Sequence, residues 1–178
     1  MSHKCNLNKI LTYCCCIIDE KNIYFPIPKN MNSAVRKSFK KYSPNSKEIN
    51  EKQYFDIQNK NEYFSFGIIR NPYKRLISFY KNLLRDDYPE WNTNIMKEIL
   101  KKLNKTYNDN EKISFEDLVS YLEISDDNEV NYHLCSQYKF LENKHYDFLA
   151  VMENQDDINY IMNKTGFTFK KINVSKSD

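Results

Sequence analysis

The chain has 178 residues, which is enough for one domain with a proper hydrophobic core. Charged residues make up 29% of it, with both signs interspersed and a net charge of +3, which is too balanced for a dedicated nucleic-acid binder. Aromatic residues make up 15%, which excludes a disordered chain.

Cysteine usage favours a reducing compartment. The five cysteines are an odd number, and three of them are adjacent at Cys14 to Cys16, so these three cannot pair with one another without strain. The sequence has no CxxC spacing, so a zinc site is not expected. The apolar run Ile10 to Ile18 is too short to span a bilayer and has no cleavage-site pattern. We therefore expect a cytoplasmic protein, in which this run is a buried edge strand rather than an acylated membrane contact.

The first half of the chain alternates between strand and helix patterns after a loose terminus at residues 1–9. The expected elements are strands at Ile10 to Ile18 and Ile23 to Ile27, a helix at Ala34 to Lys41, and a polar linker at Tyr42 to Asn61 with a short strand near Tyr54 to Ile57. Lys29 follows the second strand and Ser33 opens the helix, where backbone N–H groups can hold an anion. The alternative is a plain turn with Ser33 as N-cap.

The central stretch, Tyr63 to Leu84, predicts a buried strand up to Ile69, a turn and a helix. Asn71 can cap this helix and Pro72 suits its first turn. The helix would bury one apolar face, made of Leu76, Ile77, Tyr80, Leu83 and Leu84. Arg70 would then lie at the end of the strand and Ser78 on the second helical turn, a suitable pair for a phosphate monoester. The alternative is that Arg70 and Arg75 are solvated charges.

The second half of the chain predicts three helices and one short strand. A loop at Arg85 to Asn92 precedes a helix at Ile95 to Leu103, and Ser114-Phe115-Glu116-Asp117 is a capping-box pattern ahead of another. A short strand at Tyr146 to Met152 places Glu153 at its end. The next helix covers Gln155 to Asn163 and stops before Gly166.

This alternation predicts an α/β sandwich with a largely parallel sheet. Three strand ends would then present Lys29 with Ser33, Arg70 with Ser78, and Glu153 at one edge of the sheet. With His133, they form a candidate site for anion binding and proton transfer. The absence of GxxxxGK[ST] and GxGxxG patterns argues against a Walker-type NTPase or a dinucleotide enzyme.

Four segments, in this order, resemble the PAPS-dependent sulfotransferases, in particular the carbohydrate sulfotransferase branch. IYFPIPKNMNSAVRKSF resembles the 5′-phosphosulfate loop of the family, and FGIIRNPYKRLISFY resembles its 3′-phosphate motif. NYHLCSQYKFL and YDFLAVMENQDDINYIM resemble two further family segments, and INVS near the end resembles a short last one. The resemblance spans about Cys15 to Ser175.

The resemblance implies a single domain over residues 1–178 with a three-layer, P-loop-like fold. It implies that 3′-phosphoadenosine 5′-phosphosulfate (PAPS) is the co-substrate, that its product is 3′,5′-ADP (PAP), and that the acceptor is a hydroxyl of a carbohydrate, with no metal required. The 3′-phosphate would bind Arg70 and Ser78. The 5′-phosphosulfate would bind a loop made of Lys29, Asn30, Met31, Asn32, Ser33 and Ala34. Catalysis would fall to Lys29, which stabilises the leaving phosphate, and to His133 or Glu153 as base.

Two departures from the family pattern qualify these expectations. Met31 and Asn32 stand where relatives commonly have glycine, and Asn32 tolerates a left-handed backbone better than Met31 does. The chain also stops soon after Ser175, so a C-terminal helix of the family is expected to be missing. The alternatives are a catalytically inactive relative that binds nucleotide or glycan, and a basic nucleic-acid-binding domain, which would bind single strands with steep salt dependence.

Overall fold

A computed structural model describes residues 16–85, 89–108 and 112–169. The described chain divides into two compact units. The sheet unit comprises residues 16–71 and 136–169, and the helical unit comprises residues 72–135. The expectation of a single domain over residues 1–178 stays a prediction. The expected loose terminus at residues 1–9 lies outside the described residues.

The sheet unit is built on five strands in the order β3-β1-β2-β4-β5. Their bounds are Cys16–Ile18 for β1, Asn22–Phe25 for β2, Lys47–Ile49 for β3, Phe64–Ile69 for β4 and Phe148–Val151 for β5. The strands β2, β4 and β5 pair in parallel, whereas β1 is antiparallel to both of its neighbours. Four strands therefore run in one direction, and the predicted mostly parallel α/β sheet is confirmed.

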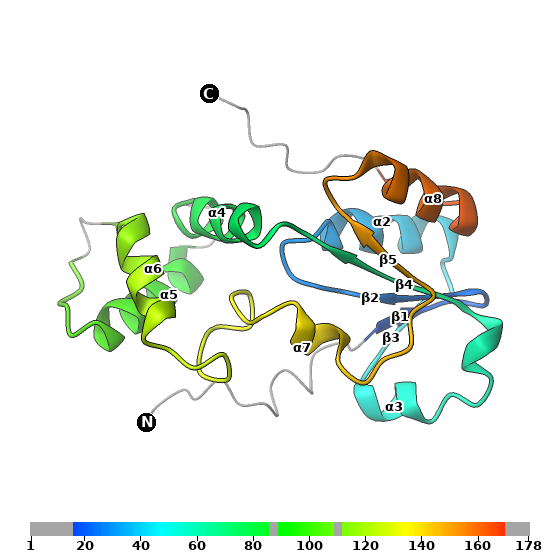
Figure 1. Ribbon diagram of the computed structural model, residues 1–178, viewed down its shortest axis with the longest axis horizontal. Coiled ribbons are helices and arrows are strands. Elements are labelled where there is room, and N and C mark those ends of the chain that lie inside the picture. The colour runs from blue at the N-terminus through cyan, green and yellow to red at the C-terminus, as the bar shows by residue number, and fades with distance from the viewer. Residues whose placement is uncertain (1–15, 86–88, 109–111, 170–178) are drawn as a thin grey trace. The chain divides into compact units, whose positions relative to one another are not determined.

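Helices cover both faces of this sheet, which gives three layers (Figure 1). One face carries α2 (Asn32–Tyr42) and α8 (Gln155–Thr165), and the other carries α3 (Glu51–Phe55) and α7 (Tyr138–Leu141). Successive strand residues point to opposite faces, so Tyr24 packs in the core with α2 and α8 while Phe25 packs with α3 and α7. Two separate apolar cores thus hold the sheet between its helices.

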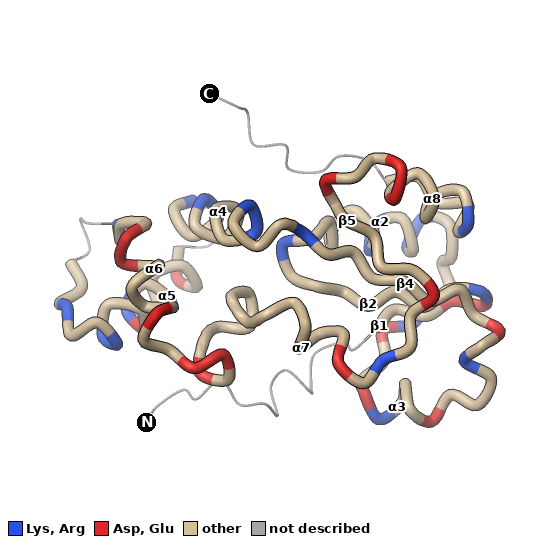
Figure 2. Tube along the Cα trace, in the orientation of Figure 1, with Lys and Arg blue, Asp and Glu red and all other residues tan. Residues whose placement is uncertain are grey.

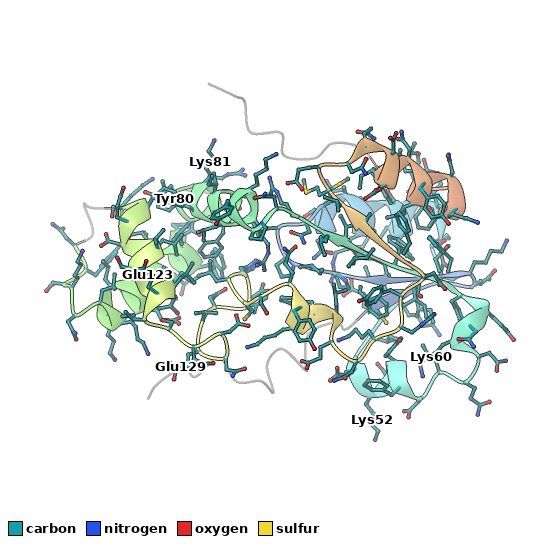
Figure 3. All side chains as sticks on the ribbon, viewed as in Figure 1. Lys52, Lys60, Tyr80, Lys81, Glu123 and Glu129 are labelled. Carbon is teal, nitrogen blue, oxygen red and sulfur yellow. The ribbon has the colours of Figure 1, made fainter. Side chains whose placement is uncertain are left out.

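The polar segment between α2 and β4 is more regular than predicted. The expected strand near Tyr54 to Ile57 is wrong, because a capping box between Asn50 and Gln53 starts α3 and Tyr54 is buried in the core. The Lys60 ammonium lies 5.2 Å from the centre of the Tyr54 ring (Figure 3). The strand of this segment is instead β3, which pairs with β1.

Because β3 covers that side, β1 lies inside the sheet and the predicted edge position of this strand is wrong. The expected strand Ile10 to Ile18 coincides with β1 over Cys16–Ile18, and its residues 10–15 lie outside the described residues. The other strand predictions are confirmed to within a few residues, as are α2 and α8, where Gly166 caps the C-terminus at φ 72°.

The helical unit contains α4 (Pro72–Leu83), α5 (Pro89–Lys102) and α6 (Phe115–Glu123). The predicted capping box of α6 is confirmed, since the Ser114 hydroxyl accepts from the Asp117 N–H and the Asp117 carboxylate accepts from the Ser114 N–H. α5 begins at Pro89, earlier than predicted, because proline suits a first helical turn. On α4, labelled in Figure 3 at Tyr80 and Lys81, the Tyr80 hydroxyl donates to the Ile113 carbonyl (2.9 Å).

The buried face of α4 is rotated from the predicted one. It consists of Arg75, Phe79 and Leu83, spaced four residues apart, whereas Ile77 is 44% exposed. Hydropathy placed Ile77 on the buried face of this helix, and a solvated Arg75 was the alternative interpretation; the structure contradicts both. Arg75 is buried because its guanidinium donates to a buried acceptor, the Cys135 carbonyl.

Candidate active site

The turn between β2 and α2 has an unusual backbone for residues other than glycine. Lys29 has φ 69° and Met31 has φ 58°, both in the left-handed region. Asn32 tolerates this conformation better than Met31 does, but it is not left-handed here, because α2 begins at Asn32. The Met31 side chain is partly buried against the core shared by α2 and α8, and this packing offsets the cost of the left-handed backbone.

The N-terminus of α2 faces out of this turn without a side-chain cap. The predicted alternative, in which Ser33 caps the helix, is wrong: the N-cap position is Met31, and Ser33 lies exposed in the first turn. The Met31 carbonyl accepts from the Ala34 and Val35 N–H groups. Within residues 16–85, 89–108 and 112–169, no hydrogen bond involves the N–H groups of Asn32 or Ser33. These two donors are available to an anion.

Asn30 anchors the turn to the sheet. Its side chain is fully buried, and its amide nitrogen donates to the Ile68 carbonyl of β4 (2.9 Å) and to Gln137 Oε1 (2.5 Å). Both donor bonds of the amide hold the turn against the sheet, and the Asn30 N–H donates to the Ile27 carbonyl (3.3 Å).

Arg70 lies where β4 ends, beside the turn. Its Nη1 donates to the Lys29 carbonyl (3.1 Å), and its buried Nε lies 3.6 Å from Glu153 Oε1, which follows β5. Glu153 Oε2 accepts from the Asn71 N–H (3.1 Å). The parallel strands thus bring Lys29, Arg70 and Glu153 to one edge, as predicted, and Figure 2 shows basic positions after both β2 and β4.

A cation and an acceptor carboxylate therefore meet at this edge, together with a helix N-terminus. The side chain of Arg70 is 19% exposed, so the alternative of a solvated arginine is wrong here. An arginine fork beside uncapped N–H donors can bind a phosphate or sulfate group.

Arg75 is also buried, but within the helical unit. It is 7% exposed, and its Nη1 donates to the Cys135 carbonyl (2.8 Å). Burial lowers the pKa of Arg75 to about 10, against the opposing influence of Cys135 and Asp127. The group stays charged at neutral pH and fixes α4 to the segment that carries His133.

His133 and Ser78 also belong to the helical unit. The His133 ring lies among aromatic rings, 4.0 Å from the Tyr132 ring centre, 5.4 Å from that of Trp91 and 6.1 Å from that of Phe79. Ser78 lies half-buried on α4. Arg70, by contrast, belongs to the sheet unit. The pairing of Arg70 with Ser78 and the role of His133 as base stay predictions.

The residue that sequence reasoning missed is Gln137. It stands at the N-cap of α7, and its amide bonds to both Asn30 and the Arg70 backbone. The only sequence signal was its place at the end of the NYHLCSQ segment, which gave it no role.

No metal site is found among the residues that the structure describes, since they contain no group of three or more His, Cys, Asp or Glu side chains placed to hold an ion. Over the same residues, no helix has both the length and the apolar composition of a membrane span.

Comparison with known proteins identifies the family. The model described as "Sulfotransferase family" matches residues 2–177, almost the entire chain. Neither the search of curated proteins nor the search of solved structures found a match. The order of the four sequence segments, the turn at the end of β2 and the arginine at the end of β4 all fit this assignment. The chain belongs to the sulfotransferase family.

Proposed function

We propose that this protein transfers a sulfuryl group from PAPS to a hydroxyl of a carbohydrate acceptor. The observation that supports it most is the edge of the sheet where Arg70 meets the uncapped turn of α2, through the bond from its Nη1 to the Lys29 carbonyl. A nucleotide with phosphates at both its 5′ and 3′ positions needs two anion sites of this kind, a short distance apart.

The two anionic groups of PAPS would bind to two different parts of this edge. The turn residues Lys29 to Ala34 receive the 5′-phosphosulfate, with the Asn32 and Ser33 N–H groups as donors. Arg70 receives the 3′-phosphate, and Ser78 on α4 joins it.

The reaction itself is a transfer between two oxygens. The acceptor oxygen attacks sulfur and forms a new S–O bond, while the bond from sulfur to the 5′-phosphate oxygen breaks and PAP leaves. Negative charge grows on that bridging oxygen, and the Lys29 ammonium stabilises it. The acceptor proton passes to a base, for which His133 is our first choice and Glu153 the second. The ion pair of Glu153 with Arg70 and its bond from the Asn71 N–H favour His133.

The acceptor side is assigned to the segments Arg85 to Leu103 and Lys105 to Asn131, which include α5 and α6. The proposal of a carbohydrate acceptor rests on the likeness of the four segments to that branch of the family.

A second candidate is a protein that binds PAPS or PAP without catalysing transfer. The observation that favours it is the turn itself, which places Met31 at φ 58° where glycine would be unstrained.

Thermal unfolding with 3′,5′-ADP, and with 5′-AMP as control, tests binding first. A ligand at about 100 times its Kd stabilises the fold by about 2.7 kcal/mol. Stabilisation by 3′,5′-ADP and a much smaller effect of 5′-AMP is the expected result; no response to either nucleotide would overturn the proposal.

Transfer of ³⁵S from labelled PAPS to a panel of glycans and simple alcohols then separates the two candidates. Incorporation into glycans that falls in His133→Ala supports the transferase, whereas binding without incorporation supports the second candidate. Full turnover by His133→Ala would assign the base role to Glu153 or to another group.

A further inference from the structure

We propose that Gln137 is a positioning residue that couples the two anion sites of the nucleotide pocket. This inference rests on the proposed function, because it concerns how the same site is held. It concerns a residue that contacts neither the proposed phosphates nor the acceptor, and whose effect passes through Asn30 and Arg70.

The Gln137 side chain pairs with the Arg70 backbone as a neighbouring strand would. Its Oε1 accepts from the Arg70 N–H (2.8 Å), and its Nε2 donates to the Arg70 carbonyl (2.7 Å). Both backbone groups of Arg70 are satisfied at the point where the ladder between β4 and β5 ends. The direction in which the Arg70 side chain leaves the sheet is thereby fixed.

The same amide also holds the phosphosulfate turn. Gln137 Oε1 accepts a second hydrogen bond, from Asn30 Nδ2, and that nitrogen donates as well to the Ile68 carbonyl. Asn30 is fully buried, so these bonds form away from water, where a lost partner is costly. One amide thus bridges the turn after β2 and the end of β4.

One more bond closes the circuit, since Arg70 Nη1 donates to the Lys29 carbonyl (3.1 Å). The ring runs from Asn30 to Gln137, on to the Arg70 backbone, out along the Arg70 side chain and back to Lys29, the neighbour of Asn30. Each proposed anion site therefore holds the other in place. The circuit requires an amide at position 137, because the position must accept two bonds and donate one.

A loss of this coupling predicts a specific defect in binding. Without Gln137, only the bonds from Arg70 to the Lys29 carbonyl and from Asn30 to the Ile68 carbonyl link the turn to the end of β4. The turn and Arg70 are then held less firmly relative to each other, so a ligand that needs both sites loses affinity while a ligand that needs one site loses little. We expect Gln137→Ala to lower the affinity for 3′,5′-ADP by at least tenfold. The affinity for 5′-AMP should change by less, so the preference for the 3′-phosphate shrinks. A general loss of stability would not change that preference among folded molecules.

Isothermal titration of the full chain with 3′,5′-ADP and with 5′-AMP measures both affinities. The variants are Gln137→Ala and Gln137→Glu, and urea unfolding shows that each is folded. Gln137→Glu keeps the oxygen that accepts from Asn30 and Arg70 but loses the donor to the Arg70 carbonyl, so its preference should lie between those of wild type and Gln137→Ala. The matched control is Gln155→Ala, an exposed glutamine of α8 bonded only to Asn159 within its own helix in the described structure.

The outcomes distinguish this inference from the proposed function. If wild-type protein binds neither nucleotide, the proposed function fails, and the inference fails with it. If wild type prefers 3′,5′-ADP and both Gln137 variants keep that preference, the inference alone is overturned. If both variants fail to fold, Gln137 is a general structural residue and the inference is again wrong.

Discussion

Replacing Arg70 with alanine is the most direct test of the nucleotide site. The side chain is 19% exposed and makes two contacts in the described structure, with the Lys29 carbonyl through Nη1 and with Glu153 through Nε at 3.6 Å. Arg70→Ala removes both contacts and leaves the Glu153 carboxylate with the Asn71 N–H as its remaining partner within the described part of the chain. The backbone bonds of residue 70 to Gln137 are unaffected, so the fold should survive.

The expected effect on binding is larger than the effect on folding. A hydrogen bond to a charged group contributes about 1.5–3 kcal/mol, and about 1.4 kcal/mol corresponds to tenfold in Kd. Loss of the arginine fork should therefore weaken 3′,5′-ADP binding by about ten- to a hundredfold. Arg70→Lys keeps the charge but not the planar fork, so its affinity for 3′,5′-ADP should lie between those of wild type and Arg70→Ala.

Isothermal titration with 3′,5′-ADP measures this loss. Lys164→Ala is the matched control, because it removes one positive charge from α8 of the same unit without touching the turn or β4. The control should bind as wild type does. Unchanged affinity in folded Arg70→Ala would refute the assignment of the 3′-phosphate to this residue.

Four further changes test the site and the fold. Lys29→Ala should lower sulfuryl turnover much more than it lowers PAP affinity, as measured by ³⁵S transfer beside titration; equal losses would contradict its role on the leaving oxygen. Met31→Val should destabilise the fold by about 1–2 kcal/mol in urea, because a β-branched residue resists φ 58°, and no loss would contradict the strain. Ser114→Ala should cost about 1 kcal/mol by removing the cap of α6, whereas Ser114→Gly should cost only a few tenths. Burial raises the pKa of Asp147, but the hydrogen bonds that its carboxylate accepts from Ser65 outweigh this effect and hold the pKa below its usual value. The ionised carboxylate therefore stabilises the fold above the unfolded pKa of about 3.9, and this stabilisation is lost as the pH falls through the lower folded pKa. Asp147→Asn should thus make the free energy of unfolding, measured in urea, less dependent on pH in the acid range.

Local signals account for the elements that sequence analysis predicted well. The capping box at Ser114 and the glycine stop at Gly166 each involve residues within one turn of a helix, so the sequence alone carries them. The apolar run of β4 is long enough to indicate a buried strand. Parallel order then places Lys29, Arg70 and Glu153 at one edge, because each follows the end of its strand.

The features that were missed depend on contacts between distant segments. The strand β3 exists because it pairs with β1, and its own sequence, Lys47–Ile49, has no strand signal. The buried Arg75 is invisible to hydropathy, because its place on α4 depends on the Cys135 carbonyl 60 residues away. Gln137 is 67 residues from Arg70 in sequence and 107 from Asn30, so no local pattern indicates that it joins them.

The turn after β2 shows how a chain with two glycines can build a loop that normally requires one. Both glycines lie elsewhere, at Gly67 in β4 and at Gly166 after α8. A left-handed backbone at a residue such as Met31 costs about 1–3 kcal/mol and persists only where the surroundings determine it.

Here three contacts determine it, and each acts on a different residue of the turn. The core holds the Met31 side chain, Ile68 and Gln137 hold the Asn30 amide, and Arg70 holds the Lys29 carbonyl. The shape that glycine would permit is thus imposed by packing and hydrogen bonds. Because one of these bonds comes from the proposed 3′-phosphate residue itself, a nucleotide that orders Arg70 would also stabilise the turn that receives its other end.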